Sequence, residues 1–181
     1  MTEKMDKIGL AIIGCGTIGR IRAKLARQFP GVEWLGLCDE KPEVGKQLAE
    51  DTKADFFTTS FEELIDRPEV NAVMILTDEN RHTAPALMAV DRGHKLFIEK
   101  PLATDARESA QILKAITEAK VDACVAYTQR FRRRFLTIKE RLSAGQIGDV
   151  HSVVTRALMN RMVPLATLAK TTERKNLTPM V

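Results

Sequence analysis

The chain has 181 residues, enough for one well-packed domain of ordinary size and too few for two full ones. Apolar residues make up 44% and charged residues 29%, which argues against disordered, fibrous and disulfide-scaffold classes. The net charge of +4 comes from 28 basic and 24 acidic residues. Such a mild excess suits anionic small molecules as well as nucleic acid, so charge alone selects no partner.

Membrane insertion and disulfide bonding are both argued against by the sequence. No stretch reaches the roughly 18 consecutive apolar residues that a membrane helix needs, and the first seven residues lack the apolar region of a secretory signal. We therefore expect a cytoplasmic protein without membrane contact. Cys15, Cys38 and Cys124 are odd in number and widely spaced, which predicts reduced, buried thiols and no metal site.

Short apolar runs alternate with longer amphipathic stretches over residues 1–127, which is typical of βαβ units and a parallel sheet. Glycine or proline residues such as Pro30, Gly31 and Gly93 separate them. Six strands with helices between them predict an α/β fold, a doubly wound Rossmann sheet. The expected strands are 8–13, 32–38, 55–59, 70–76, 95–98 and 122–126, and the expected helices are 18–29, 42–50, 61–66, 81–92 and about 105–120.

Two of these helices carry particular local patterns. Ile18, Ile21, Leu25 and Phe29 recur at spacings of three and four, which predicts an amphipathic helix. Ser60 with Glu63 three residues later predicts a capping box, in which each side chain satisfies an otherwise unpaired amide.

The alternation of apolar runs and amphipathic stretches ends after residue 127. We therefore assign residues 128–181 to a hinge and the beginning of a second α/β domain. A helix is expected at 135–142 and a strand at 150–155, while residues 159–181 show no clear period. The basic run 130–134 has few neighbouring aromatic residues and matches no nucleic-acid-binding motif, so we expect no nucleic-acid partner.

A glycine-rich loop follows the first expected strand and opens the first helix. Its sequence is Gly14-Cys15-Gly16-Thr17-Ile18-Gly19. In this context Gly14 permits a tight turn, Gly16 lets a pyrophosphate approach the backbone, and Gly19 lets the helix lie close to the sheet. The free amides at the helix N-terminus then favour a negatively charged diphosphate. The loop predicts a dinucleotide site.

Two further residues refine that prediction. Asp39 stands twenty residues after Gly19 at the end of the second strand, where its carboxylate can bind both ribose hydroxyls of NAD. Lys41 lies close enough to keep NADP use open. Lys100 follows the fifth strand, where ligands gather in open α/β sheets, and it can assist loss of a substrate hydroxyl proton. Pro101 could form a cis peptide bond.

The combination of motifs resembles the Gfo/Idh/MocA oxidoreductase family over residues 7–160. The shared segments are the glycine loop, Asp39, Glu99-Lys100-Pro101, residues 126–131 and residues 145–150. The resemblance implies NAD(P) as cofactor, a sugar, inositol or related polyol as substrate, a second domain with a large open sheet, homo-oligomeric full-length relatives, and Lys100 as the catalytic lysine. It also implies that these residues lie along the cofactor: Thr17, Ile18, Thr77, Asn80, His82 and Glu99. From the residues alone, His82 and His94, which flank an expected helix, are more typical of helix caps or surface residues than of ligands or acid–base groups.

Family members also carry an Asp and a His downstream that complete catalysis with the lysine. In this sequence no Asp follows Asp149, and the only later histidine is His151. We therefore expect a chain that keeps the cofactor site and lacks part of the catalytic site. The alternative is a noncatalytic dinucleotide-binding module.

Overall fold

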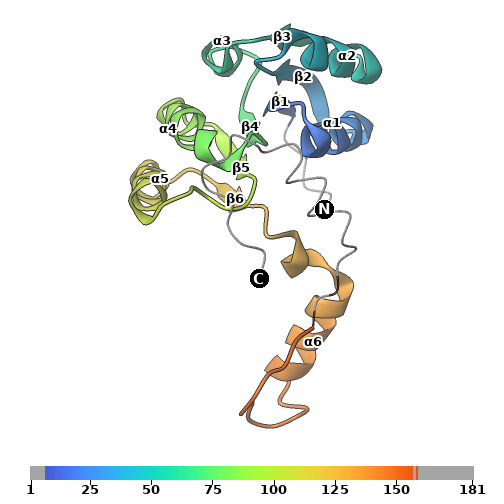
Figure 1. Ribbon diagram of the computed structural model, residues 1–181, viewed down its shortest axis with the longest axis vertical. Coiled ribbons are helices and arrows are strands. Elements are labelled where there is room, and N and C mark those ends of the chain that lie inside the picture. Colours follow the sequence, from blue (N-terminus) through green and yellow to red (C-terminus); the bar gives the residue numbers. More distant parts are fainter. Residues whose placement is uncertain (1–6, 157, 159–181) are drawn as a thin grey trace. The chain divides into compact units, whose positions relative to one another are not determined.

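The computed structural model describes residues 7–156 and 158, and the chain divides into two units. The first unit ends at Tyr127 and the second begins at Thr128. Figure 1 shows the elements of both, and each unit is described by itself. The predicted extension of the second domain over residues 159–181 lies outside the described residues.

The first unit is built on one sheet of six parallel strands in the order β3-β2-β1-β4-β5-β6 (Figure 1). The chain moves outward from β1 to β3 and then returns to β4 on the other side of β1. This reversal confirms the predicted doubly wound fold and creates a switch point between β1 and β4. The strands are β1 (Ile8–Ile13), β2 (Val32–Cys38), β3 (Phe56–Thr58), β4 (Ala72–Ile75), β5 (Lys95–Ile98) and β6 (Ala123–Val125).

Five α-helices connect the strands, and the reversal distributes them over two faces. Right-handed crossovers place α1 and α2 on one side of the sheet and α3, α4 and α5 on the other, as Figure 1 shows. The predicted helix over 81–92 is confirmed as α4, which begins at Thr83 after a short 3-10 helix, η1 (Glu79–Arg81). The helices are α1 (Thr17–Gln28), α2 (Pro42–Thr52), α3 (Phe61–Ile65), α4 (Thr83–Asp91) and α5 (Ala106–Ala119).

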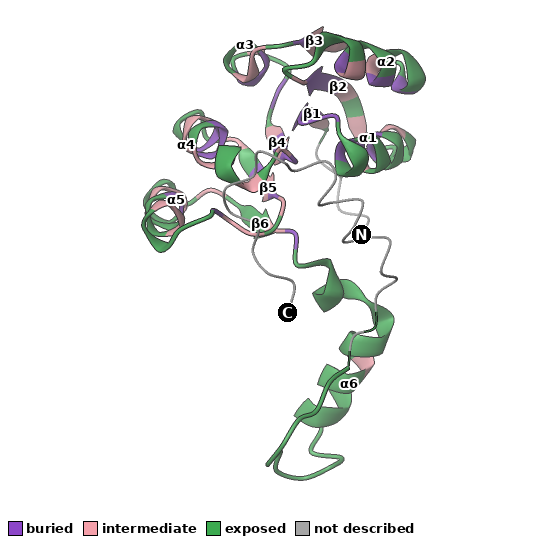
Figure 2. Ribbon diagram, in the orientation of Figure 1, coloured by how far each residue is buried: buried purple, intermediate pink, exposed green. Residues whose placement is uncertain are grey.

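The core lies on both faces of the central strands, which Figure 2 shows as largely buried. Alternate residues of β1 enter two different clusters: Ala11 and Ile13 pack with residues under α3 to α5, whereas Leu10 and Ile12 pack with residues under α1 and α2. A strand buried on both faces needs a nearly continuous apolar sequence. This requirement explains why these strands were predicted well.

The apolar stripe of α1 is largely exposed and is not packed into the core. Its large members are between 41% and 61% exposed, while Gly19, Ala23 and Ala26 are the buried residues of the helix. A Cβ atom on Gly19 would lie 1.9 Å from the Gly14 carbonyl oxygen. The helix therefore approaches the glycine loop so closely that only small residues fit beneath it. The exposed members are Ile18, Ile21, Leu25 and Phe29.

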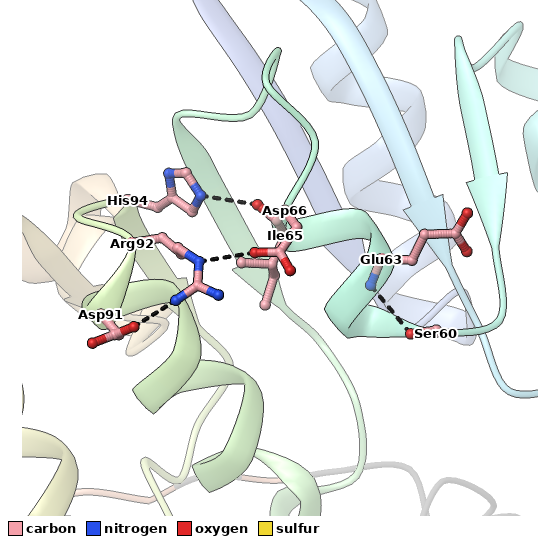
Figure 3. Close-up of polar contacts among 7 residues, drawn as sticks. All are labelled: Ser60, Glu63, Ile65, Asp66, Asp91, Arg92 and His94. Atoms are coloured by element: carbon pink, nitrogen blue, oxygen red, sulfur yellow. Dashed lines mark hydrogen bonds and ion pairs between the residues drawn. The ribbon is translucent and has the colours of Figure 1, made fainter.

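The Ser60 cap forms, but only half of the predicted capping box does. The Ser60 hydroxyl accepts a hydrogen bond from the Glu63 amide at 3.2 Å, which Figure 3 shows. The Glu63 carboxylate instead accepts the Thr58 hydroxyl, and the Ser60 amide donates to Thr58 Oγ1 at 3.2 Å. Thr58 thus replaces the reciprocal contact of the box.

Contacts of Arg92 and His94 fix the end of α4 against the end of α3 (Figure 3). Arg92 Nε donates to Asp66 Oδ1 at 2.8 Å, and His94 Nε2 lies 3.0 Å from the Ile65 carbonyl oxygen. His94 therefore has a structural partner at a helix end, which agrees with its predicted capping position.

The second unit contains η2 (Thr128–Phe131) and α6 (Arg133–Ser143) within its described part. The helix α6 includes the predicted range 135–142 and begins two residues earlier. The predicted strand at 150–155 is wrong, because residues 150–156 form no regular element. A strand requires a ladder partner for its backbone groups, and the described residues of this unit contain no other strand. Across the described ranges of both units, no helix combines the length and apolar character needed to cross a bilayer.

Candidate functional site

A hollow of about 750 Å³ lies where β1, β2 and β4 end, next to the switch point, and we call it the cofactor hollow. Its volume falls in the range of ligand-binding pockets in proteins. Ligands of open α/β sheets gather at this edge because the loops after the strands separate there. Its lining includes the predicted site residues Gly14, Gly16, Asp39, Thr77 and Asn80.

The glycine loop has the geometry that its sequence predicts. Gly14 has a φ of +99°, and a Cβ there would lie 2.7 Å from the Leu76 carbonyl carbon. A Cβ on Gly16 would meet no atom within 4 Å, although Gly16 directly precedes α1. The loop therefore leaves open space beside the amides of a helix N-terminus, where a diphosphate can bind. Thr17 and Ile18 form the first turn of α1 and are not among the lining residues of the hollow.

Asp39 ties the end of β2 to the glycine loop. Its Oδ2 accepts a hydrogen bond from the Cys15 amide at 2.7 Å, and its Oδ1 accepts one from the Lys41 amide at 2.9 Å. A carboxylate has about four acceptor positions, so two remain for ribose hydroxyls. The sequence predicts the ribose contact but not the bond to Cys15, which depends on the approach of β1 and β2.

The loop after β4 supplies a polar wall. Thr77, Asn80 and Arg81 all line the hollow. The Thr77 hydroxyl is buried and has no hydrogen-bond partner among the described residues. An unpaired buried hydroxyl is costly in free energy, and a bound polar ligand in the hollow would satisfy it. Together with the open cradle at Gly16, this hydroxyl fits a dinucleotide.

His82 is buried and is the N-cap residue of α4, without a side-chain cap hydrogen bond, so the predicted cap position is confirmed and the alternative surface position is wrong. Its Nδ1 lies 3.0 Å from the Pro101 carbonyl oxygen and its Nε2 lies 3.2 Å from the Thr77 carbonyl oxygen. The ring therefore joins the loop after β4 to the loop after β5. His82 does not line the hollow, and in this structure it positions the backbone of Thr77.

Glu99 and Lys100 follow β5, and an arginine fixes the first of them. Arg22 Nη2 donates to Glu99 Oε1 at 2.9 Å, while Glu99 Oε2 accepts the Lys100 amide at 2.7 Å. The Lys100 side chain is exposed, and the peptide bond before Pro101 is cis, as anticipated. Neither Glu99 nor Lys100 lines the cofactor hollow.

Sequence reasoning missed Arg22. The residue lies between Gly19 and Ala26 on the buried side of α1, and its guanidinium carbon lies 4.5 Å from the Phe97 ring centre. Arg22 is three residues after Gly19 and four before Ala26, so it shares their face of the helix. A charged side chain on a buried face needs a partner of opposite charge. This spacing could have identified Arg22 from the sequence.

Two of the three cysteines are buried beside the hollow. Burial, followed by the negative charge of Asp39, raises the pKa of Cys15 and Cys38 to about 12. Both thiols are therefore protonated at neutral pH and are poor nucleophiles. Cys124 is exposed, so its predicted burial is wrong, because it lies on the edge strand β6.

Comparisons with known proteins agree with this geometry. Residues 8–127 match the Gfo/Idh/MocA model, described as an oxidoreductase family with an NAD-binding Rossmann fold. The chain is 27% identical over 143 residues to scyllo-inositol 2-dehydrogenase (NAD(+)) of Bacillus subtilis, covering 78% of this chain and 42% of that protein. It is 30% identical over 146 residues to inositol 2-dehydrogenase of Gluconacetobacter diazotrophicus, covering 79% of this chain and 43% of the relative.

A solved structure shows the same fold. Scyllo-inositol dehydrogenase from Lactobacillus casei, with bound NAD(H) and scyllo-inositol, superimposes with a TM-score of 0.75 at 20% identity, over 80% of this chain and 43% of that one. The chain thus spans less than half the length of these relatives. Since the family match extends from β1 to the end of the first unit, the chain belongs to the Gfo/Idh/MocA family of oxidoreductases with an NAD-binding Rossmann fold.

Proposed function

We propose that this chain is the cofactor-binding part of an NAD-dependent dehydrogenase that moves hydride between nicotinamide and a hydroxyl carbon of an inositol, sugar or related polyol. The observation that carries the proposal is the open cradle at Gly16, beside the α1 N-terminus and the Asp39 carboxylate. The inositol dehydrogenases among its relatives favour this substrate class.

Each part of the cofactor hollow has a role in this proposal. The α1 amides bind the diphosphate, the Asp39 carboxylate accepts the ribose hydroxyls, and the Thr77 hydroxyl gains a partner. Bound NAD supplies the hydride acceptor. Glu99 holds the Lys100 amide, so that the lysine lies at the end of β5 and, as the neutral amine, can accept a proton from a substrate hydroxyl.

The wider expectations from the sequence remain predictions. We propose that Thr17, Ile18, His82 and Glu99 support the cofactor through the backbone that they position. We also propose that the division at Tyr127 separates a cofactor domain from a substrate domain, that full-length relatives are homo-oligomers, and that the protein is cytoplasmic.

A noncatalytic dinucleotide-binding module is the second candidate. The exposed position of Lys100, outside the lining of the cofactor hollow, favours it. In that case the cofactor hollow would bind NAD without turnover.

Binding and turnover separate these candidates. The protein should quench or shift NADH fluorescence on binding, and NAD reduction should be followed at 340 nm with a panel of inositols and sugars. Lys100→Met should keep the Kd for NADH within about twofold and abolish turnover. Lys95→Met, at the opposite end of β5, is the control and should change neither quantity.

Three results are decisive. Turnover that depends on Lys100 supports the dehydrogenase. NADH binding without turnover on any polyol, by the whole protein to which this cofactor-binding part belongs, supports the noncatalytic module. Failure of the folded protein to bind either NADH or NADPH contradicts both candidates.

A further inference from the structure

An ion pair of opposite charges stands at the ribose side of the cofactor hollow. Glu40 follows Asp39 at the end of β2, and Arg81 ends η1 after β4. Arg81 Nη1 donates to Glu40 Oε2, and both residues line the hollow. The two residues are 41 positions apart in the sequence. The pair therefore joins the loops on either side of the place where Asp39 would bind a ribose.

The Glu40–Arg81 pair lies among other charged residues of the cofactor hollow. The hydrogen bond and charge of Glu40, followed by the charges of Asp78 and Asp39, raise the pKa of Arg81. Lys41 lines the same hollow. The Asp39 carboxylate is already oriented by two backbone amides, so it is held in place, whereas Arg81 is held by Glu40.

Arginine is well suited to bind a phosphate, because its planar guanidinium can donate two parallel hydrogen bonds. A 2′-phosphate on the adenosine ribose carries up to two negative charges and is the only group by which NADP differs from NAD. In this chain that phosphate would meet the carboxylates of Asp39 and Glu40 and a guanidinium that already has a partner.

We propose that the Glu40–Arg81 pair determines the cofactor preference of this chain: Glu40 occupies the guanidinium that would otherwise bind a 2′-phosphate. The inference rests on the proposed function, because it concerns the same hollow. Both side chains are more than half exposed, and exposed ion pairs contribute little to stability. Removing Glu40 therefore frees Arg81 at small structural cost.

The test compares NADH and NADPH affinities by fluorescence titration. The wild-type protein should bind NADH more tightly than NADPH. Glu40→Gln should lower the ratio of the NADPH Kd to the NADH Kd at least tenfold. Glu43→Gln is the matched control, because it removes the same charge from the first turn of α2 at a residue that does not line the hollow. This control should leave the ratio within twofold.

The double variant Glu40→Gln/Arg81→Gln separates a freed guanidinium from a mere change in net charge. The gain in NADPH affinity should disappear in it. If the gain persists, or if Glu43→Gln produces an equal gain, the inference is overturned. A wild-type preference for NADPH overturns it as well.

One further variant keeps the test decisive. Arg81→Gln alone leaves the Glu40 carboxylate unpaired, so that it repels a 2′-phosphate more strongly. It should therefore weaken NADPH binding at least threefold and leave NADH binding within twofold, whether or not Glu40→Gln folds. An equal loss for both cofactors would contradict the inference. Failure of the wild-type protein to bind either cofactor would instead remove the proposed function, and the inference with it.

Discussion

Two hollows of the first unit differ greatly in chemistry. The cofactor hollow lies at the carboxyl ends of the strands and gathers carboxylates, amides and a guanidinium. A second hollow of about 410 Å³, which we call the apolar groove, lies between α1 and the middle of the strands. Its lining is mainly apolar and includes Leu25, Phe29, Met74 and Phe97.

The doubly wound topology explains both hollows. The reversal between β1 and β4 opens the loops at the cofactor hollow. The same reversal moves α3, α4 and α5 to the opposite face from α1, so the described helices of the first unit leave the α1 side of β4 and β5 open. A hollow in this fold therefore does not by itself mark function. The convergent polar groups at the strand ends do.

Arg22 lines the apolar groove and also holds Glu99, which follows β5 at the carboxyl edge of the sheet. The contrast between the hollows predicts which substitutions affect stability, which affect binding and which affect neither.

The largest effect is expected for Gly19→Ala. The new Cβ would lie 1.9 Å from the Gly14 carbonyl oxygen, a backbone atom that cannot move without displacing the glycine loop. We expect the free energy of unfolding to fall by roughly 3 kcal/mol or more, with NADH binding lost as the loop shifts. Urea denaturation checks the first expectation. Wild-type stability in this variant would contradict the close approach of α1.

A smaller loss of stability is expected for Arg22→Met. The Arg22 and Glu99 side chains are 22% and 14% exposed, so removing the arginine leaves a largely buried carboxylate unpaired. Breaking a fully buried pair costs more, and for this pair we expect about 2 kcal/mol. Denaturant unfolding provides the measurement.

Two variants sharpen the Arg22 prediction. Adding Glu99→Gln to Arg22→Met should restore part of the stability, because a neutral amide needs no counter-charge. Arg20→Met is the control, since Arg20 makes an exposed 3.6 Å pair with Asp51, and it should change the unfolding free energy by less than about 0.5 kcal/mol. Equal losses at both arginines would contradict the role of Glu99.

The local parts of the fold were predictable from the sequence. Strands such as β1 and β4 are continuous apolar runs, and Ser60 and Asp105 both cap helices through the amides three residues later. The glycine loop and Asp39 follow from spacing, because their roles depend on one strand-to-helix turn and the end of the next strand.

The remaining features depend on tertiary structure. Arg22 and Glu99 are 77 residues apart in the sequence, and only the sheet order brings them together. The exposed stripe of α1 has the same period as a buried one, so periodicity cannot distinguish an exposed face from a buried face. Residues 150–155 have the β-branched composition of a strand, but a strand depends on its ladder partners. Ion pairs between distant residues and the pairing partners of strands cannot be predicted from local sequence patterns.

Gly16→Ala should reduce cofactor binding while sparing the fold. Gly16 has a φ of −65°, which alanine adopts readily, and its Cβ would enter empty space in the cofactor hollow. We expect the Kd for NADH to rise at least about tenfold, or roughly 1.4 kcal/mol, with the unfolding free energy changed by less than about 0.5 kcal/mol. Titration calorimetry and thermal melts measure the two quantities. Unchanged affinity would place the diphosphate elsewhere.

The smallest effect is expected for Leu25→Gln in the apolar groove. Leu25 is 61% exposed, so little apolar area returns to water, and the unfolding free energy should change by less than about 0.5 kcal/mol. The Kd for NADH should stay within twofold because the residue lies outside the cofactor hollow. Leu48→Gln, at a fully buried position of α2, is the contrasting control and should cost several kcal/mol. A tenfold loss of NADH affinity in Leu25→Gln would show that the two hollows are coupled through α1, since that helix carries Leu25 in the apolar groove and offers its first amides to the diphosphate.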